Sequence, residues 1–447
     1  MKNKTWAYFS TSGTSLVCLA LGCVSGILAA RLLKAEGRGE LAVITYLPGL
    51  AAMFFPLAIP QALTFFISKE PYRTEEIAAA GFRMSLVLGA AGAIAIFVFG
   101  KYVLTEEKRH LTGAITIVGL MMPAMVVNPH LYAIHRGVHR FSLINGLLMF
   151  AAGGYVVLLL GLWIAGRVCA LNIAIGIQCL QIAIAIISGW CIGSCLLKTR
   201  VEWSTYRLCL LQGLKFWLPA LALTLFAVSD RAILIRTTNL EQMGYYAAAF
   251  AVGFPFSLVS EGFAQIGFVE ISGANNKQIA SDLLARRFQM VQMVALCSVL
   301  GGLPFVRPVI QYGFGKEFIA AAPVAYFVVI AMSFRGLCWT LECGLRAKNL
   351  IAPAVAANLT ALGCLVFFAA LLVPDHNALG FGIALLLAQT FGLAVMIVAT
   401  KQTIGIPFSQ LYGIRPAIVM ALGRNLLSLV KSRQTDAHPY NAATSQL

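Results

Sequence analysis

Residues 143–165 read LINGLLMFAAGGYVVLLLGLWIA, an apolar stretch that contains no charged residue. A helix needs about 20 such residues to cross the hydrocarbon core of a bilayer, so this stretch predicts a membrane span. Similar stretches recur between charged or Pro- and Gly-rich breaks. The predicted spans are 9–30, 42–67, 80–100, 112–134, 143–165, 171–196, 209–235, 245–269, 288–311, 319–343, 352–373 and 379–400. The sequence therefore predicts an all-α integral membrane protein with about twelve transmembrane helices.

The composition supports a membrane protein as well. Hydrophobic residues make up 60% of the chain and charged residues 11%. Soluble domains have about 45–50% apolar and about 25% charged residues, so a soluble fold is excluded. The first span follows Lys2 and Lys4, but it continues into a multi-spanning pattern, and we expect a retained helix and not a signal peptide.

The chain is basic, with 33 Lys and Arg against 17 Asp and Glu. The basic residues are scattered between apolar segments and are not interleaved with aromatic residues, so we expect no nucleic-acid partner. Instead they orient the helices and contact membrane lipids. Alternate connections differ about twofold in their Lys and Arg content, with the excess on the side of the N-terminus. This bias predicts that both termini are cytoplasmic.

The organisation of the chain is predicted in three parts. An N-terminal six-helix bundle spans 1–200, a C-terminal six-helix bundle spans 201–400, and a basic tail spans 401–447. Within the tail, residues 418–430 place apolar residues at helical spacing opposite Arg424 and Lys431. This pattern predicts a helix that lies on the membrane surface.

A short repeat relates the two bundles. The segment RLLKAEGRGELA at 31–42 aligns with RTTNLEQMGYYA at 236–247, and both contain the pattern R-x4-E-x2-G-x2-A. In each case the pattern falls between the first and second span of a set of six. Two such halves in parallel imply a pseudo-twofold axis along the membrane normal, with a cavity between the halves.

These segments also carry a family resemblance. ARLLKAEGRGELA at the end of the first span, SDRAIL in the seventh and LEQMGYYAAAF leading into the eighth resemble the polysaccharide (O-antigen-type) flippases. These belong to the multidrug/oligosaccharidyl-lipid/polysaccharide exporter superfamily. This chain departs from the pattern at Lys34-Ala35, where the family usually has Gly-Pro, and at Thr237-Thr238. The resemblance implies two six-helix bundles arranged in a V, alternating access, a cationic central cavity and a location in the bacterial cytoplasmic (inner) membrane.

Charged residues inside spans are the candidate site, since each costs about 2.5–3.5 kcal/mol to insert. The guanidinium group of Arg matches phosphate oxygens, which suits a pyrophosphate cargo. The predicted substrate-binding cations are Arg335, Lys215, Arg231, Arg236 and Arg31. Two alternatives stay open: cations near an interface can extend to water, and Arg335 can pair with Glu342.

The acidic residues inside spans are Asp230, Glu261 and Glu342. They are predicted either to bind a coupling H⁺ or Na⁺ or to neutralise nearby cations. His130, His135 and His139 are expected to form a wet interfacial cluster, and the cysteines to pack as small residues, so no metal site is predicted. No phosphate-binding loop is present, and no cofactor is expected.

The resemblance and these residues together predict a transporter. It would flip an undecaprenyl-pyrophosphate-linked oligosaccharide across the membrane for surface polysaccharide synthesis, and other polysaccharide assembly proteins are expected as partners. One alternative is an ion-coupled small-molecule or multidrug exporter of the same superfamily. Another is a membrane polymerase or ligase, although the longest predicted outer connection, 101–111, leaves little room for a catalytic loop.

Overall fold

The computed structural model describes residues 2–272, 277–348 and 350–406, and within these ranges the chain is helical without a β-strand. The all-α prediction is thereby confirmed. The main helices are α1 (Lys2–Phe54), α2 (Ile59–Lys69), α3 (Thr74–Val103), α4 (Thr112–Leu120), α5 (Pro123–Gly137), α6 (Phe141–Ile164), α7 (Ala170–Ile192), α8 (Cys195–Lys198), α9 (Trp203–Thr237), α10 (Leu240–Ser272), α11 (Lys277–Pro308), α12 (Ala321–Ala347) and α13 (Ile351–Ile404). Short helical turns join them: η1 (Pro71–Arg73), η2 (Glu106–Leu111), η3 (Val309–Phe314) and η4 (Lys316–Phe318).

Eight helical stretches of the described chain are long and apolar enough to cross a membrane. Two of the helices, α1 and α13, have 53 and 54 residues and break at Lys34 and Asn377, where φ is positive. At about 1.5 Å per residue each is far longer than the roughly 30 Å of hydrocarbon, so each accounts for two predicted spans. The chain is a multi-pass membrane protein.

Two predicted spans are interrupted in the structure. The span predicted over 42–67 breaks between Phe54 and Ile59, where Leu57 and Ala58 have positive φ. Pro56 and Pro60 lack the backbone N–H that a continuous helix needs, which explains this break. The span predicted over 112–134 is divided into α4 and α5 just before Pro123, which begins α5 for the same reason.

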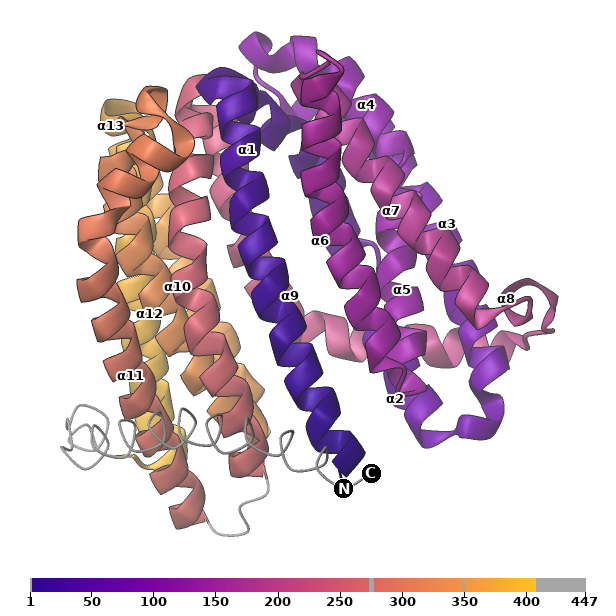
Figure 1. Ribbon diagram of the computed structural model, residues 1–447. Helices are drawn as coiled ribbons and strands as arrows, with labels where there is room; N and C mark the ends of the chain where they lie inside the picture. The colour runs from indigo at the N-terminus through magenta and orange to yellow at the C-terminus, as the bar shows by residue number, and fades with distance from the viewer. Residues whose placement is uncertain (1, 273–276, 349, 407–447) are drawn as a thin grey trace, which may run out of the picture.

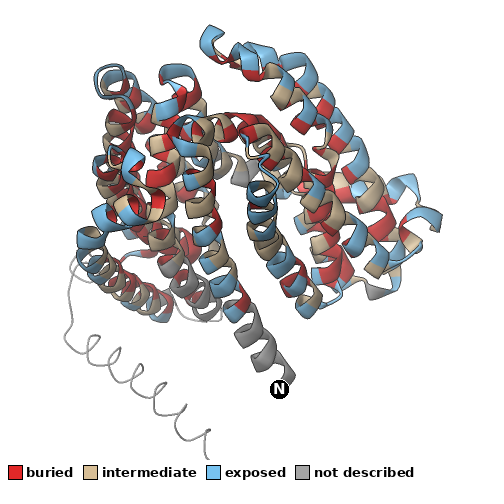
Figure 2. Cartoon of the chain, turned by 45° about the horizontal axis from the view of Figure 1, so that its top comes forward, coloured by how far each residue is buried: buried red, intermediate tan, exposed pale blue. Residues whose placement is uncertain are grey.

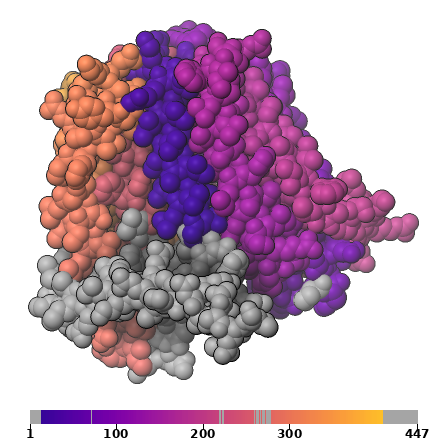
Figure 3. Space-filling view, in the orientation of Figure 1, coloured from indigo at the N-terminus to yellow at the C-terminus, as the bar shows by residue number. Residues whose placement is uncertain are grey.

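The helices form two groups with α1 between them (Figure 1). Below, α1–α8 are called the N-terminal half and α9–α13 the C-terminal half. The space-filling view shows α1 filling the seam between the groups (Figure 3). Buried residues line the faces that helices turn toward one another (Figure 2). The predicted boundary near residue 200 and the cytoplasmic placement of the termini stay predictions, and the predicted tail helix over 418–430 lies outside the described residues.

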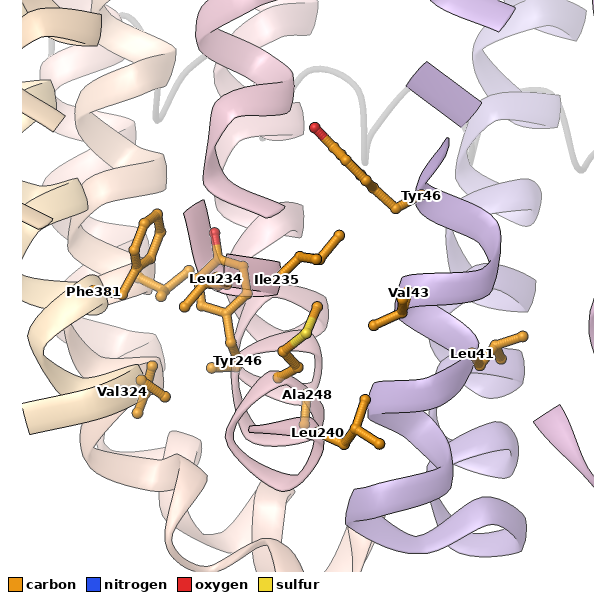
Figure 4. Close-up of a cluster of buried hydrophobic side chains, with 14 of the residues drawn as sticks. Leu41, Val43, Tyr46, Leu234, Ile235, Leu240, Tyr246, Ala248, Val324 and Phe381 are labelled. Carbon is orange, nitrogen blue, oxygen red and sulfur yellow. The ribbon is translucent and has the colours of Figure 1, made fainter. Parts of the chain in front are cut away.

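The largest hydrophobic cluster joins the two halves (Figure 4). It contains Leu41 and Val43 of α1, Leu234 of α9, Tyr246 of α10 and Phe381 of α13, all at most 5% exposed. Because this cluster crosses the seam, burial of apolar side chains holds the halves together.

The repeat forms a reciprocal contact between α1 and α10. A Cβ atom added at Gly39 would overlap the carbonyl oxygen of Leu240, and one added at Gly244 would overlap that of Ala35. Gly39 and Gly244 are equivalent positions of the repeat, and so are Ala35 and Leu240. A glycine of each half therefore contacts the backbone of the other half, and the contacted residues occupy equivalent positions of the repeat. We call this region, defined by these four residues, the joined end.

Candidate functional site

Four cations cross between the halves at or near the joined end. Arg31 on α1 donates hydrogen bonds to the carbonyl oxygens of Tyr312 and Gly313, at the end of η3. Arg236, its equivalent in the repeat, donates to the carbonyl oxygen of Tyr102 at 3.3 Å. The structure therefore places Arg31 and Arg236 against backbone carbonyl oxygens near the ends of helices in the opposite half. Carbonyl groups at the end of a helix have no hydrogen-bond partner within that helix.

The other two cations are Lys108 and Lys34. Lys108 is 1% exposed and donates from Nζ to the carbonyl oxygens of Ile235 and Thr238. Lys34 forms an ion pair with Glu317, with 3.5 Å between Nζ and Oε1. These contacts satisfy the end of α9 and tie the halves together.

A second group of charges lies around Asp230 on α9. The Asp230 carboxylate is 7% exposed, and it accepts hydrogen bonds from the Tyr246 hydroxyl at 2.9 Å and from the Arg231 backbone N–H at 2.7 Å. Arg231 and Arg335 lie close enough to interact with this carboxylate electrostatically. Two cations therefore lie beside this carboxylate, which is the arrangement expected if Asp230 neutralises a nearby Arg.

Arg38 joins this group from the N-terminal half. It interacts electrostatically with Arg231 across the seam and with Tyr155 on α6. Its Nε atom is buried and has no hydrogen-bond partner in the described structure. Arg38 is not among the predicted site residues, although it lies inside the repeat motif at 31–42. We call Arg38, Arg231 and Arg335, with Asp230, the central cluster.

The two remaining guanidinium groups of the central cluster rest on aromatic rings. The Arg231 guanidinium lies 6.0 Å from the ring centre of Phe250, and that of Arg335 lies 5.7 Å from the ring centre of Phe226. Arg231 is exposed and Arg335 is half-buried. Contacts with ring faces leave most of the N–H donors of a guanidinium free for another ligand.

Lys215 and Glu261 complete the predicted charged residues. Lys215 is exposed on α9, well before Arg231 in the sequence. Glu261 lies on α10, and its side chain is outside the part of the structure described. Their predicted roles in cargo or ion binding stay predictions.

Glu342 lies in a small pocket within the C-terminal half. Its carboxylate is 2% exposed and pairs with Arg346 one turn along α12, not with Arg335. The pocket has a volume of about 10 Å³, room for about one water molecule. Trp339 Nε1 and Gln389 Nε2 line it as buried donors without a partner in the described structure. The pocket can therefore hold one small polar species.

A larger cavity of about 490 Å³ opens at the joined end. Four carboxylates line it, those of Glu36, Glu107, Glu241 and Glu317, with Lys34 among them. Carboxylates repel an anionic cargo, so this cavity does not suit a pyrophosphate.

The predicted histidine cluster is not brought together as a metal site. His130 hydrogen-bonds with the carbonyl oxygen of Val126 at 2.8 Å, and His135 with the Ser188 hydroxyl at 3.0 Å. Both rings are fully buried, which corrects the expectation of a wet interfacial cluster. They lie within the helix packing of the N-terminal half, where the α5–α7 contact shields His135 from water.

No family model matches the sequence, and no curated protein matches it. The fold is similar to solved structures of transporters. The lipid II flippase MurJ in an inward closed conformation has a TM-score of 0.73 at 14% identity, over 93% of this chain and 92% of that chain. An inward-facing multidrug resistance MATE family transporter of the MOP superfamily has a TM-score of 0.73 at 13% identity, over 87% and 98%.

A eukaryotic MATE transporter is similar as well, with a TM-score of 0.60 at 14% identity, over 92% of this chain and 99% of that chain. All three are transporters, and the likeness shows that the chain shares their fold. The fold that the sequence resemblance implied agrees with the fold of these neighbours. The chain is similar in fold to a lipid II flippase and to MATE transporters.

Proposed function

We propose that the chain flips a lipid-linked oligosaccharide carried on undecaprenyl pyrophosphate across the bacterial cytoplasmic membrane. The observation that carries this proposal is the central cluster. It brings Arg38 from one half together with Arg231 and Arg335 from the other, and none of the three forms an ion pair with a second acid in the described chain. Guanidinium groups with free donors bind pyrophosphate oxygens by charge-assisted hydrogen bonds.

The joined end supports alternating access as the mechanism. The two halves touch there through Gly39 and Gly244 and through the Arg31 and Arg236 hydrogen bonds. A cargo bound to the central cluster would leave on that side only after these contacts separate. In this proposal the joined end faces the cell exterior, and cargo enters from the cytoplasmic side.

The test is a flipping assay with purified protein in liposomes that contain a fluorescent undecaprenyl-pyrophosphate oligosaccharide. Arg335→Ala and Arg38→Ala should each lower the flipping rate about tenfold or more, since a charge-assisted hydrogen bond contributes about 1.5–3 kcal/mol. Arg167→Ala is the matched control, because its side chain is exposed in the connection between α6 and α7. Wild-type rates in both cluster variants would refute the assignment. If Arg335→Lys restores the flipping rate, positive charge at this position is sufficient. If it does not, the paired N–H donors of the guanidinium group are needed.

The Glu342 pocket favours a second candidate, an ion-coupled exporter of small molecules. A buried carboxylate beside a space for one water is suited to a coupling H⁺ or Na⁺. The same liposomes distinguish the two, with a dye in place of the oligosaccharide. Dye export driven by an ion gradient and lost in Glu342→Gln, without saccharide flipping, would favour the exporter.

A further inference from the structure

An exposed surface of aromatic and basic residues lies where the two halves are connected. It consists of Trp190, Leu197, Lys198, Arg200, Trp203 and Arg207, and we call it the connection surface. The exposed fractions of Trp190, Leu197 and Trp203 are 84%, 71% and 80%. Figure 1 shows α8, at the centre of this surface, projecting from the side of the N-terminal half. The proposed transport mechanism uses none of these residues.

The backbone beneath the surface is fixed in place. Arg83 on α3 donates from Nη2 to the carbonyl oxygens of Leu197 at 2.9 Å and Thr199 at 2.7 Å. Leu196 is 4% exposed and packs into the core of the N-terminal half. At the start of α9, the Thr205 hydroxyl accepts from Arg73 at 2.7 Å. These contacts fix the backbone that carries the exposed side chains of Leu197 and Trp203.

The charges on this surface are predominantly positive. Lys198, Arg200 and Arg207 are exposed, and none forms an ion pair in the described chain. The nearby exposed acids are Glu75 and Glu202, which leaves an excess of cations. Trp side chains favour the interface between hydrocarbon and water, and Lys and Arg beside them attract anionic lipid. If this surface faced bulk water, the large apolar surfaces of Trp190 and Trp203 would be hydrated, which is unfavourable.

We propose that the connection surface binds the headgroups of anionic phospholipids. Trp190 and Trp203 insert at headgroup depth, and Lys198, Arg200 and Arg207 contact the phosphates. Because α9 begins at Trp203, headgroups bound here hold the start of the helix that carries Asp230 and Arg231. Lipid composition would then act on the connection between the halves.

The experiment places the full chain in nanodiscs of phosphatidylcholine with phosphatidylglycerol and counts retained lipids by native mass spectrometry. The wild type should retain phosphatidylglycerol preferentially. The variant K198Q/R200Q/R207Q should lose that preference by at least about fivefold, since each cation near an anionic surface contributes about 1 kcal/mol. The control K101Q/R167Q/K316Q removes three exposed cations elsewhere and should retain it.

Three results would overturn the proposal. These are equal retention of the two lipids by the wild type, unchanged preference in K198Q/R200Q/R207Q, or an equal loss in the control. If the connection surface binds an acidic protein instead of lipid, the wild type should retain the two lipids equally. If the triple variant does not fold, R200Q alone should give a smaller loss in the same direction, and no loss would count against lipid binding. The assay contains no cargo, so its outcome is independent of the flipping test.

Discussion

At the scale of single residues, Lys108 shows how a cation can serve as a structural link. It comes from the short polar connection before α4, yet its side chain is buried. Its ammonium group donates to the carbonyl oxygens of Ile235 and Thr238, at the end of α9. These carbonyls have no partner in their own helix, so a donor from the other half satisfies them.

We predict that Lys108→Met destabilises the protein by about 1–3 kcal/mol, because it leaves two buried carbonyl oxygens without a donor while keeping the length of the side chain. The measurement is the thermal unfolding midpoint in detergent. Lys101→Met is the control, since Lys101 is exposed at the end of α3. Equal midpoints for the two variants would show that the Lys108 hydrogen bonds contribute nothing.

At the scale of elements, the contact between α1 and α10 depends on two glycines. Backbone approaches this close require the absence of a Cβ atom. Gly39 and Gly244 occupy equivalent positions of the repeat, so each half contributes one glycine and one backbone carbonyl to the contact. Gly22, also on α1, has no neighbour within 4 Å of an added Cβ.

We expect Gly39→Ala and Gly244→Ala each to force the joined end apart, because the added methyl group would meet backbone that cannot rotate away. Spin labels placed on α1 and α10 should report a longer distance in both variants. Gly22→Ala should leave the distance unchanged, and its helix should be slightly more stable. An unchanged distance in Gly39→Ala would show that α1 and α10 adjust without separating.

At the scale of the whole molecule, the joined end connects two bundles that share a core. Lys34 and Glu317 bridge it from opposite halves. Alternating access requires this bridge to break in each cycle, whereas the packing within each half stays intact.

Cross-linking Lys34→Cys to Glu317→Cys, in a background without the eleven native cysteines, should abolish transport. Reduction should restore it. A cross-link between Glu106→Cys and Arg109→Cys, which joins two residues of one turn, should have no effect. Transport that persists across the first cross-link would mean that the joined end does not open.

The sequence by itself determined the all-α membrane fold and the repeat, because lipid requires long apolar helices and the shared motif marks equivalent positions. It also identified Asp230, Arg231 and Arg335 as charged residues within spans, because charge is costly in lipid wherever the helix lies. Only the tertiary structure decided which charges meet. Glu342 pairs with Arg346, Arg31 and Arg236 bind backbone carbonyls, and Arg38 joins the central cluster. Arg346 lies one turn from Glu342 on α12, but the other partners come from helices far apart in the chain. Helical spacing along one segment carries no information about its neighbours in space.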